Sequence, residues 1–155
     1  MANKPKKTPR KLARAQAFQF LYGLNFSPAM TIESLQEAYT ISPDNADKPE
    51  AQCQPEGFTW ELIEGVWSNY RALDDVIGQF SRHWKVDRIG KIELTLLRLA
   101  VFEMLYREDI PPKVAINEAI ELAKQFGDER SRPFVNGLLD AAAKALDEGT
   151  LKLKY

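Results

Sequence analysis

The amino-acid sequence predicts an all-α protein of about seven helices. Apolar residues recur at helical spacing, no stretch of useful length alternates with a period of two, and proline or glycine separates the periodic stretches. The 155 residues are 45% hydrophobic and 28% charged, as in ordinary soluble globular proteins. This length fits one domain that needs neither a disulfide nor a metal to fold. We expect that domain over residues 9–148, between a flexible basic arm at 1–8 and a tail at 149–155.

The first helix is expected from about residue 9 to 25. Thr8 has the side chain of an N-cap residue, and Pro9 suits the first helical position. Ser27 and Pro28 end the helix. Its apolar positions follow the spacing i, i+4, i+7, i+8, which predicts one buried face. They are Ala13, Ala17, Phe20, Leu21 and Leu24.

A short second helix at 31–39, with Thr31 as its cap, precedes a stretch rich in proline and acidic residues. That stretch, residues 40–57, predicts an exposed loop. Helical periodicity resumes near residue 57 and reaches Ser81, either as one helix or with a new start at Leu73.

The second half of the chain has the stronger helical pattern. Residues 91–107 are apolar almost all round, which predicts a helix at the centre of a core. Pro111 and Pro112 break it, and a helix at 113–126 follows with Gly127 as its stop. The last helix starts near Ser131 and tolerates a proline in its first turn.

Positive charge is concentrated at the N-terminus. No acidic residue precedes Glu33, and residues 1–32 carry six of the 21 basic residues, so the remainder has 15 basic against 22 acidic residues, a net charge of −7. Clustered lysines and arginines release condensed counterions when they meet phosphates, which indicates a polyanionic partner. The six residues are Lys4, Lys6, Lys7, Arg10, Lys11 and Arg14.

Arg10, Lys11 and Arg14 fall in the first turns of the first helix and share one face. The partial positive charge of a helix N-terminus disfavours cations there, but a bound phosphate would meet the free N–H groups, the dipole and the side chains together. The alternative interpretation is a solubilising tail that continues into a helix.

The sequence contains no motif for catalysis or for a cofactor. With one cysteine, Cys53, and one histidine, His83, it cannot build the usual Cys/His zinc site. Phosphate-cradling glycine motifs and nucleophile motifs are missing. We therefore expect no enzyme activity, cofactor or metal, although an active site of carboxylates assembled in space remains an alternative. No apolar run spans a bilayer and no signal peptide is recognisable, so we expect a cytoplasmic protein without a membrane partner.

Phe126 and Phe134 flank a helix-to-helix turn that contains Arg130 and Arg132. Phe126 fits the inward stripe of its helix. Phe134 lies in a first turn beside a cation and either stacks on a base or packs on the neighbouring helix. An exposed aromatic ring among cations is typical of single-stranded RNA recognition.

Two C-terminal segments are distinctive enough to identify a family. They are Pro112-Lys-Val-Ala-Ile-Asn-Glu-Ala-Ile-Glu-Leu-Ala-Lys-Gln-Phe-Gly127 and Phe134-Val-Asn-Gly-Leu-Leu-Asp140. Together with the Ala-x-x-x-Leu-Tyr ending of the first helix, they resemble the NusB family of bacterial transcription antitermination factors. The resemblance covers about residues 9 to 146.

The resemblance implies two packed helical halves, here about 9–82 and 83–148, and no catalysis. It implies binding of single-stranded boxA RNA from rRNA leader transcripts, together with the ribosomal protein NusE, and entry into an RNA polymerase antitermination complex. By this resemblance, the protein-partner surface includes Glu93. The RNA-binding positions are Arg10, Lys11, Arg14, Lys124, Arg130, Arg132, Phe134 and Asn136.

Three alternatives stay open from the sequence. The same motifs occur in the NusB-like RNA-binding domain of rRNA cytosine methyltransferases, so the chain is either an antitermination factor or a stand-alone relative of that domain. A helical DNA-binding regulator would need a second basic helix, which the sequence does not offer. The third alternative concerns the oligomeric state: some NusB relatives self-associate through the surface that RNA uses, so the chain is either a monomer or a homodimer.

Overall fold

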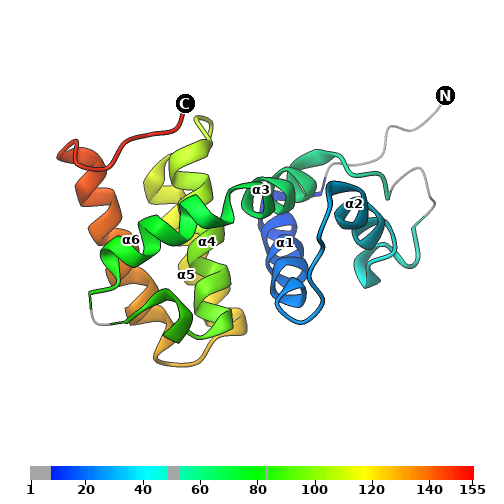
Figure 1. The fold of residues 1–155 in the computed structure, drawn as a ribbon, viewed down its shortest axis with the longest axis horizontal. Helices are drawn as coiled ribbons and strands as arrows, with labels where there is room; N and C mark the ends of the chain where they lie inside the picture. The colour runs from blue at the N-terminus through cyan, green and yellow to red at the C-terminus, as the bar shows by residue number, and fades with distance from the viewer. Residues whose placement is uncertain (1–7, 49–52, 83) are drawn as a thin grey trace. The chain divides into compact units, whose positions relative to one another are not determined.

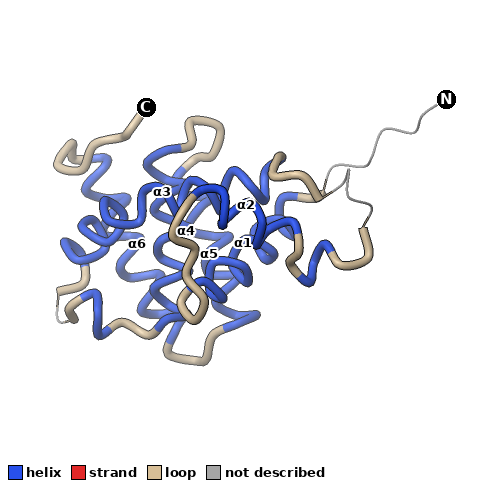
Figure 2. Tube along the Cα trace, turned by 45° about the vertical axis from the view of Figure 1, so that its right-hand side comes forward, coloured by secondary structure: helices blue, strands red, loops and turns tan. Residues whose placement is uncertain are grey.

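The computed structural model describes residues 8–48, 53–82 and 84–155. These residues form α-helices and loops without a β-strand, which confirms the all-α prediction (Figures 1 and 2). Six α-helices and two short 3₁₀ turns lie in the described ranges, where the sequence predicted about seven helices. The helices are α1 (Arg10–Leu24), α2 (Ile32–Thr40), α3 (Gly57–Phe80), α4 (Lys91–Tyr106), α5 (Pro112–Phe126) and α6 (Ser131–Asp147).

Contacts divide the chain into two compact units, residues 1–64 and 65–155. The boundary between these units falls inside α3, because α3 is one uninterrupted helix of 24 residues, which begins in the first unit and ends in the second. The two halves implied by the family resemblance, about 9–82 and 83–148, stay a prediction. The alternative start at Leu73 is therefore excluded, because Leu73 lies inside this helix and is fully buried.

Helix α1 buries one face, as its spacing predicted, with Ala13, Ala17 and Phe18 almost inaccessible. Its start differs from the prediction by one residue. Pro9 occupies the N-cap position and no side chain caps the helix, so the expected Thr8 cap is wrong. Pro9 cannot accept a hydrogen bond through its side chain, and the first N–H groups of α1 therefore lack a side-chain cap.

The cap of α2 was predicted correctly. Thr31 Oγ1 accepts a hydrogen bond from the Ser34 backbone N–H at 3.1 Å, and Ser34 Oγ accepts one from the Thr31 N–H at 3.1 Å. This reciprocal pair is a capping box with serine in the place of the usual glutamate. Below it, Leu35 is fully buried within the first unit.

The segment at 40–57 is less exposed than predicted. A 3₁₀ turn, η1 (Pro43–Asn45), folds it back so that Asn45 Nδ2 donates to the Tyr39 carbonyl at 2.7 Å. Cys53 is 3% exposed, and its Sγ donates to the Asn45 carbonyl at 3.4 Å. The prediction of an exposed loop is therefore wrong at Asn45 and Cys53, because hydrogen bonds from their side chains to backbone carbonyls fold the segment back on itself. Residues 49–52 of the predicted loop lie outside the described residues.

Helix α4 is the centre of the second unit, as its all-round apolar sequence predicted. Eleven of its residues, between Leu94 and Leu105, are buried, and α5 and α6 pack against it (Figure 1). Gly65 of α3 lies directly against the Phe102 ring, so that an added Cβ would collide with it. Glycine at this position allows α3 to approach α4 closely.

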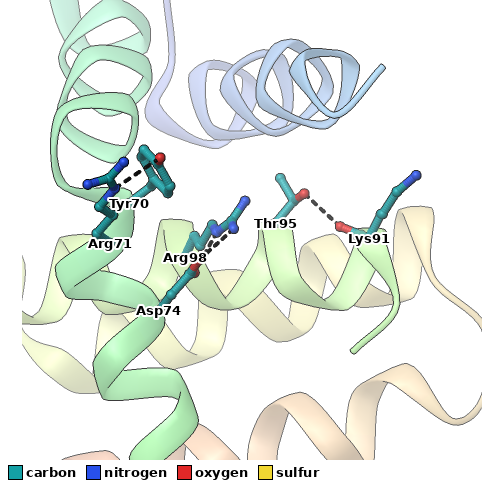
Figure 3. A network of polar contacts seen from close by, with 6 residues as sticks. All are labelled: Tyr70, Arg71, Asp74, Lys91, Thr95 and Arg98. Atoms are coloured by element: carbon teal, nitrogen blue, oxygen red, sulfur yellow. Dashed lines mark hydrogen bonds and ion pairs between the residues drawn. The ribbon is translucent and has the colours of Figure 1, made fainter. Parts of the chain in front are cut away.

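An ion pair also links α3 to α4 (Figure 3). Arg98 Nε and Nη2 donate to the two carboxylate oxygens of Asp74, each at 2.7 Å. The Arg98 guanidinium lies 5.8 Å from the centre of the Tyr70 ring. This bidentate geometry fixes the second half of α3 on α4 more strongly than a single contact would.

Candidate nucleic-acid interface

The N-terminal turns of α1 carry the first group of predicted RNA-binding residues, Arg10, Lys11 and Arg14. Arg10 and Lys11 are exposed. Arg14 is 4% exposed, although its spacing predicted the same accessible face. A phosphate can therefore reach the first two side chains directly, whereas Arg14 lies beneath the surface. Lys4, Lys6 and Lys7 lie outside the described residues.

Phe58 lies beside the guanidinium groups of both arginines. It lies in the first turn of α3, within the same unit as α1. The Arg10 guanidinium carbon is 4.3 Å from the centre of the Phe58 ring, and that of Arg14 is 5.3 Å away. Cations attracted to an aromatic ring lose rotational freedom, so Phe58 positions two guanidinium groups at the start of α1.

The second predicted region surrounds a cavity of about 340 Å³ in the second unit. Phe134, in the first turn of α6, is half-buried and lines it. The ring is thus neither fully in the core nor fully on the surface, and both of its predicted roles remain open. We call this space the Trp84–Phe134 cavity. It is lined by Trp84, Arg88, Ile89, Gly90, Glu93, Asp128, Arg130 and Phe134.

Glu93 lies in the wall of this cavity, in the first turn of α4. Ser131 Oγ donates a hydrogen bond to Glu93 Oε1 at 2.7 Å, and Ser131 itself is 1% exposed. The other carboxylate oxygen, Oε2, lies against Gly90, where an added Cβ would collide with it. The buried Ser131 hydroxyl therefore orients the Glu93 carboxylate, and the missing side chain at Gly90 leaves room for it.

Asp128 also lines the cavity, from the turn before α6. Its Oδ1 accepts hydrogen bonds from the backbone N–H groups of Arg130 at 2.8 Å and Ser131 at 3.2 Å. The Asp128 side chain thus caps free N–H groups before the helix, where a carboxylate also suits the helix dipole. Asp128 and Glu93 line the cavity together with Arg88 and Arg130, so its wall contains two carboxylates and two guanidinium groups.

Three other predicted residues do not line the cavity. Lys124 is exposed and pairs with Glu121, with 3.2 Å between Nζ and Oε1. Arg132 is exposed, and Asn136 is half-buried. These side chains therefore supply charge and polarity on the second unit without sharing the cavity with Phe134.

The sequence did not identify Trp84 and Arg88 as site residues. Trp84 is 58% exposed, although a tryptophan beside a helical stretch is usually expected in the core. One feature of the sequence could have indicated that Trp84 is exposed: it lies in residues 81–90, a short connection whose apolar residues do not follow helical spacing. Its neighbour His83, the one histidine of the chain, lies outside the described residues.

Neither a metal site nor a membrane span was found in the described part of the chain. No group of three or more histidine, cysteine or acidic side chains is placed there to hold a metal ion. None of the helices described is long and apolar enough to cross a membrane.

The chain is similar to proteins of known family over nearly its whole length. The NusB family model matches residues 11–144. The transcription antitermination protein NusB of Oleidesulfovibrio alaskensis is 63% identical over 155 residues, which cover 100% of both chains. The protein of the same name from Nitratidesulfovibrio vulgaris is 65% identical over 148 residues, or 95% of this chain and 96% of the relative.

Solved structures agree with this match. The structure of T. maritima NusB superimposes with a TM-score of 0.72 at 33% identity and covers 94% of this chain and 100% of its own. A chain from the complex of antitermination factors NusB and NusE with double-stranded RNA gives a TM-score of 0.69 at 28% identity, with coverages of 88% and 96%. Sequence and fold thus lead to one assignment: the chain belongs to the NusB family.

Proposed function

We propose that this NusB family member binds boxA RNA of rRNA leader transcripts together with NusE and enters an RNA polymerase antitermination complex. The observation that carries the proposal is the match to antitermination proteins over the full length of both chains. A similar structure contains NusB, NusE and RNA, which supports the same partners here. The sites described above supply the chemistry that such binding needs.

In this proposal the RNA-binding residues divide by task. Arg10 and Lys11 contact phosphates, and Phe58, which also lies beside the buried Arg14, positions Arg10. The phosphate contacts on the second unit come from Lys124, Arg130 and Arg132. Phe134 supplies a ring for base stacking, and Asn136 supplies an amide for a base edge.

Glu93 was predicted from the resemblance to contact NusE. Its carboxylate lines the same cavity as Phe134 and Arg130, and this position favours a role at the RNA site. A carboxylate next to a phosphate would repel it, so any contact from Glu93 to RNA must go to a hydrogen-bond donor on a base.

The protein acts as a binding adaptor in this proposal, and no bond is made or broken. Its place of action is the bacterial cytoplasm, where leader transcripts are made.

The alternative kinship with rRNA methyltransferase domains is less well supported, because the relatives named as antitermination proteins match over all or nearly all of their own length. A monomer and a homodimer are both compatible with adaptor function, and sedimentation with and without RNA distinguishes them.

Gel-shift titrations test the proposal with boxA RNA, scrambled RNA, double-stranded RNA and duplex DNA, each with and without NusE. We expect boxA RNA to bind most tightly. We also expect NusE to raise its affinity by roughly 5–150-fold, the usual range for coupled sites, and RNA to raise NusE affinity by the same factor. Equal binding of all four nucleic acids, or an RNA affinity that saturating NusE leaves unchanged, would contradict the adaptor mechanism.

A further inference from the structure

We propose that the Trp84–Phe134 cavity holds a single guanine base, which Glu93 recognises through its Watson–Crick edge. This inference rests on the proposed RNA-binding function and names the base that the site selects. It adds Trp84 and Arg88 to the binding residues and gives Glu93 a role in specificity. Three properties of the cavity lead to it.

The first property is an exposed aromatic surface at the cavity. Trp84 is 58% exposed, whereas Trp60, in the core, is 9% exposed. An indole left in water costs solvation free energy unless a ligand covers it, and a base offers a flat π-face of suitable size. The Phe134 ring borders the same space, so a base in the cavity has an aromatic surface available from two segments.

The second property is a fixed carboxylate. Ionised carboxylates only accept hydrogen bonds, so Glu93 selects a ligand that presents donors. Ser131 Oγ occupies one acceptor site of Oε1, and the half-buried Glu93 side chain lines the cavity, so we assign the remaining acceptor sites to the ligand. Because Ser131 is buried and Gly90 has no side chain, this orientation exists before the ligand arrives.

Guanine matches two carboxylate oxygens better than the other bases do. Its Watson–Crick edge places two donors, N1–H and the N2 amine, side by side, and they can meet Oε1 and Oε2 together. Adenine and cytosine each present one amine beside an acceptor nitrogen, which would face a carboxylate oxygen unfavourably. Uracil presents one N–H between two carbonyl oxygens. Unpaired bases in single-stranded RNA expose this edge to proteins.

The third property is the charge balance of the wall. Arg88 and Arg130 compensate Glu93 and Asp128, and Asp128 is already engaged with backbone N–H groups. The negative charge of Glu93 therefore does not exclude an RNA strand from the cavity. The two guanidinium groups are available for the phosphates on either side of the base.

The test uses short uridine oligomers that carry one central guanosine, inosine, adenosine or cytidine, with boxA RNA as the reference ligand. Inosine keeps N1–H and lacks the N2 amine. We expect the wild-type protein to bind the guanosine oligomer about 5–100-fold more tightly than the others, as for a bidentate contact to a base. Binding should also quench the fluorescence of the exposed Trp84.

Two variants separate recognition of the edge from stacking. Glu93→Gln keeps the volume and an acceptor for Ser131 but replaces one oxygen by a donor, so it should bind all four oligomers equally. Trp84→Leu should weaken all four alike and remove the quenching. Glu129→Gln is the matched control, because Glu129 lies in the same turn, is exposed and does not line the cavity. It should retain the preference for guanosine.

The outcomes distinguish this inference from the function on which it rests. If the wild-type protein binds boxA RNA but binds the four oligomers equally, the guanine site is wrong and the RNA-binding function stands. The same conclusion follows if Glu93→Gln retains the wild-type preference. If boxA RNA itself does not bind, both proposals are wrong.

Discussion

The start of α1 and the Trp84–Phe134 cavity both combine arginines with aromatic rings, but they do so in opposite ways. At α1, Phe58 contacts two arginines and leaves Arg10 and Lys11 exposed. At the cavity, the aromatic Trp84 is itself exposed, and two carboxylates balance the arginines. The first region therefore offers positive charge to a ligand. The second offers the exposed Trp84 ring for stacking and the oriented Glu93 carboxylate as a hydrogen-bond acceptor.

We therefore expect the start of α1 to contribute affinity for RNA in general, and the cavity to contribute selectivity among bases. Phosphate contacts are the same for every RNA sequence, so they raise affinity without selecting among bases. A nearly neutral cavity gains little from the charge of the strand and must depend on stacking and hydrogen bonds, which vary with the base. The salt dependence of binding should therefore report on α1, and the base preference should report on the cavity.

The largest expected effect is that of Phe134→Leu. If the ring stacks on a base, this variant loses roughly 1–3 kcal/mol of RNA-binding free energy, and the slope of log K against log salt stays unchanged. Isothermal titration at several salt concentrations and a thermal melt measure both properties. If the melting temperature falls and RNA affinity stays intact, the ring belongs to the core. Phe102→Leu is the control for a core position: it should lower the melting temperature and leave RNA affinity intact, because Phe102 is buried.

A smaller loss is expected for the double variant Arg10→Ala/Lys11→Ala. Each lost phosphate contact should flatten the salt slope by roughly 0.7 for a single strand. The variant without two contacts should therefore lose about 25-fold of the affinity that the wild-type protein gains between 1 M and 0.1 M salt. The melting temperature should change little, because both side chains are exposed. Lys152→Ala/Lys154→Ala removes two exposed cations at the other end of the chain and should leave the slope intact. An unchanged slope in the α1 variant would refute its phosphate role.

Arg14→Ala should change stability more than salt dependence. The side chain is buried against Phe58, so its removal leaves a gap and is expected to lower the free energy of unfolding by about 1–2 kcal/mol. Urea titrations of Arg14→Ala and Arg10→Ala provide the comparison. An Arg14→Ala variant with wild-type stability and a flatter salt slope would mean that Arg14 reaches RNA directly.

The smallest effect is expected for Phe58→Leu, about 0.5–1 kcal/mol in RNA-binding free energy from weaker positioning of Arg10. In the Arg10→Ala background the same change should have no further effect on affinity. A double-mutant cycle measured by RNA titration tests this dependence. Additive losses would show that Phe58 acts independently of Arg10. Phe58→Tyr keeps the ring face and serves as the control.

Most of the helices could be predicted because their causes are local. The all-round apolar stretch of α4 and the cap at Thr31 depend on neighbours within a few residues, and both predictions are confirmed. The predicted Gly127 stop is also confirmed, but for another reason. Its backbone is extended, and a side chain there would collide with Ser131 and with the Ala123 carbonyl. The glycine allows a close approach that the spacing could not reveal.

The site was predictable only in part. Spacing placed Arg14 on the face of Arg10, but Arg14 lies beneath the surface, beside Phe58, which comes more than forty positions later in the chain. The motif around Phe134 identified one wall of the cavity. Trp84, Arg88 and Glu93 reach it from segments about forty to fifty positions away, and no local pattern connects them.

The sequence by itself therefore determined the helices, the family and the N-terminal concentration of positive charge, since these follow from composition and from short-range periodicity. The tertiary structure alone decided which arginine is accessible, that Glu93 is held by Ser131 over Gly90, and that an exposed tryptophan borders the Phe134 cavity. The physical reason is that helix formation depends on residues three or four positions apart. A binding cavity depends on how distant segments pack around the α4 core, and that packing has no signature in local spacing.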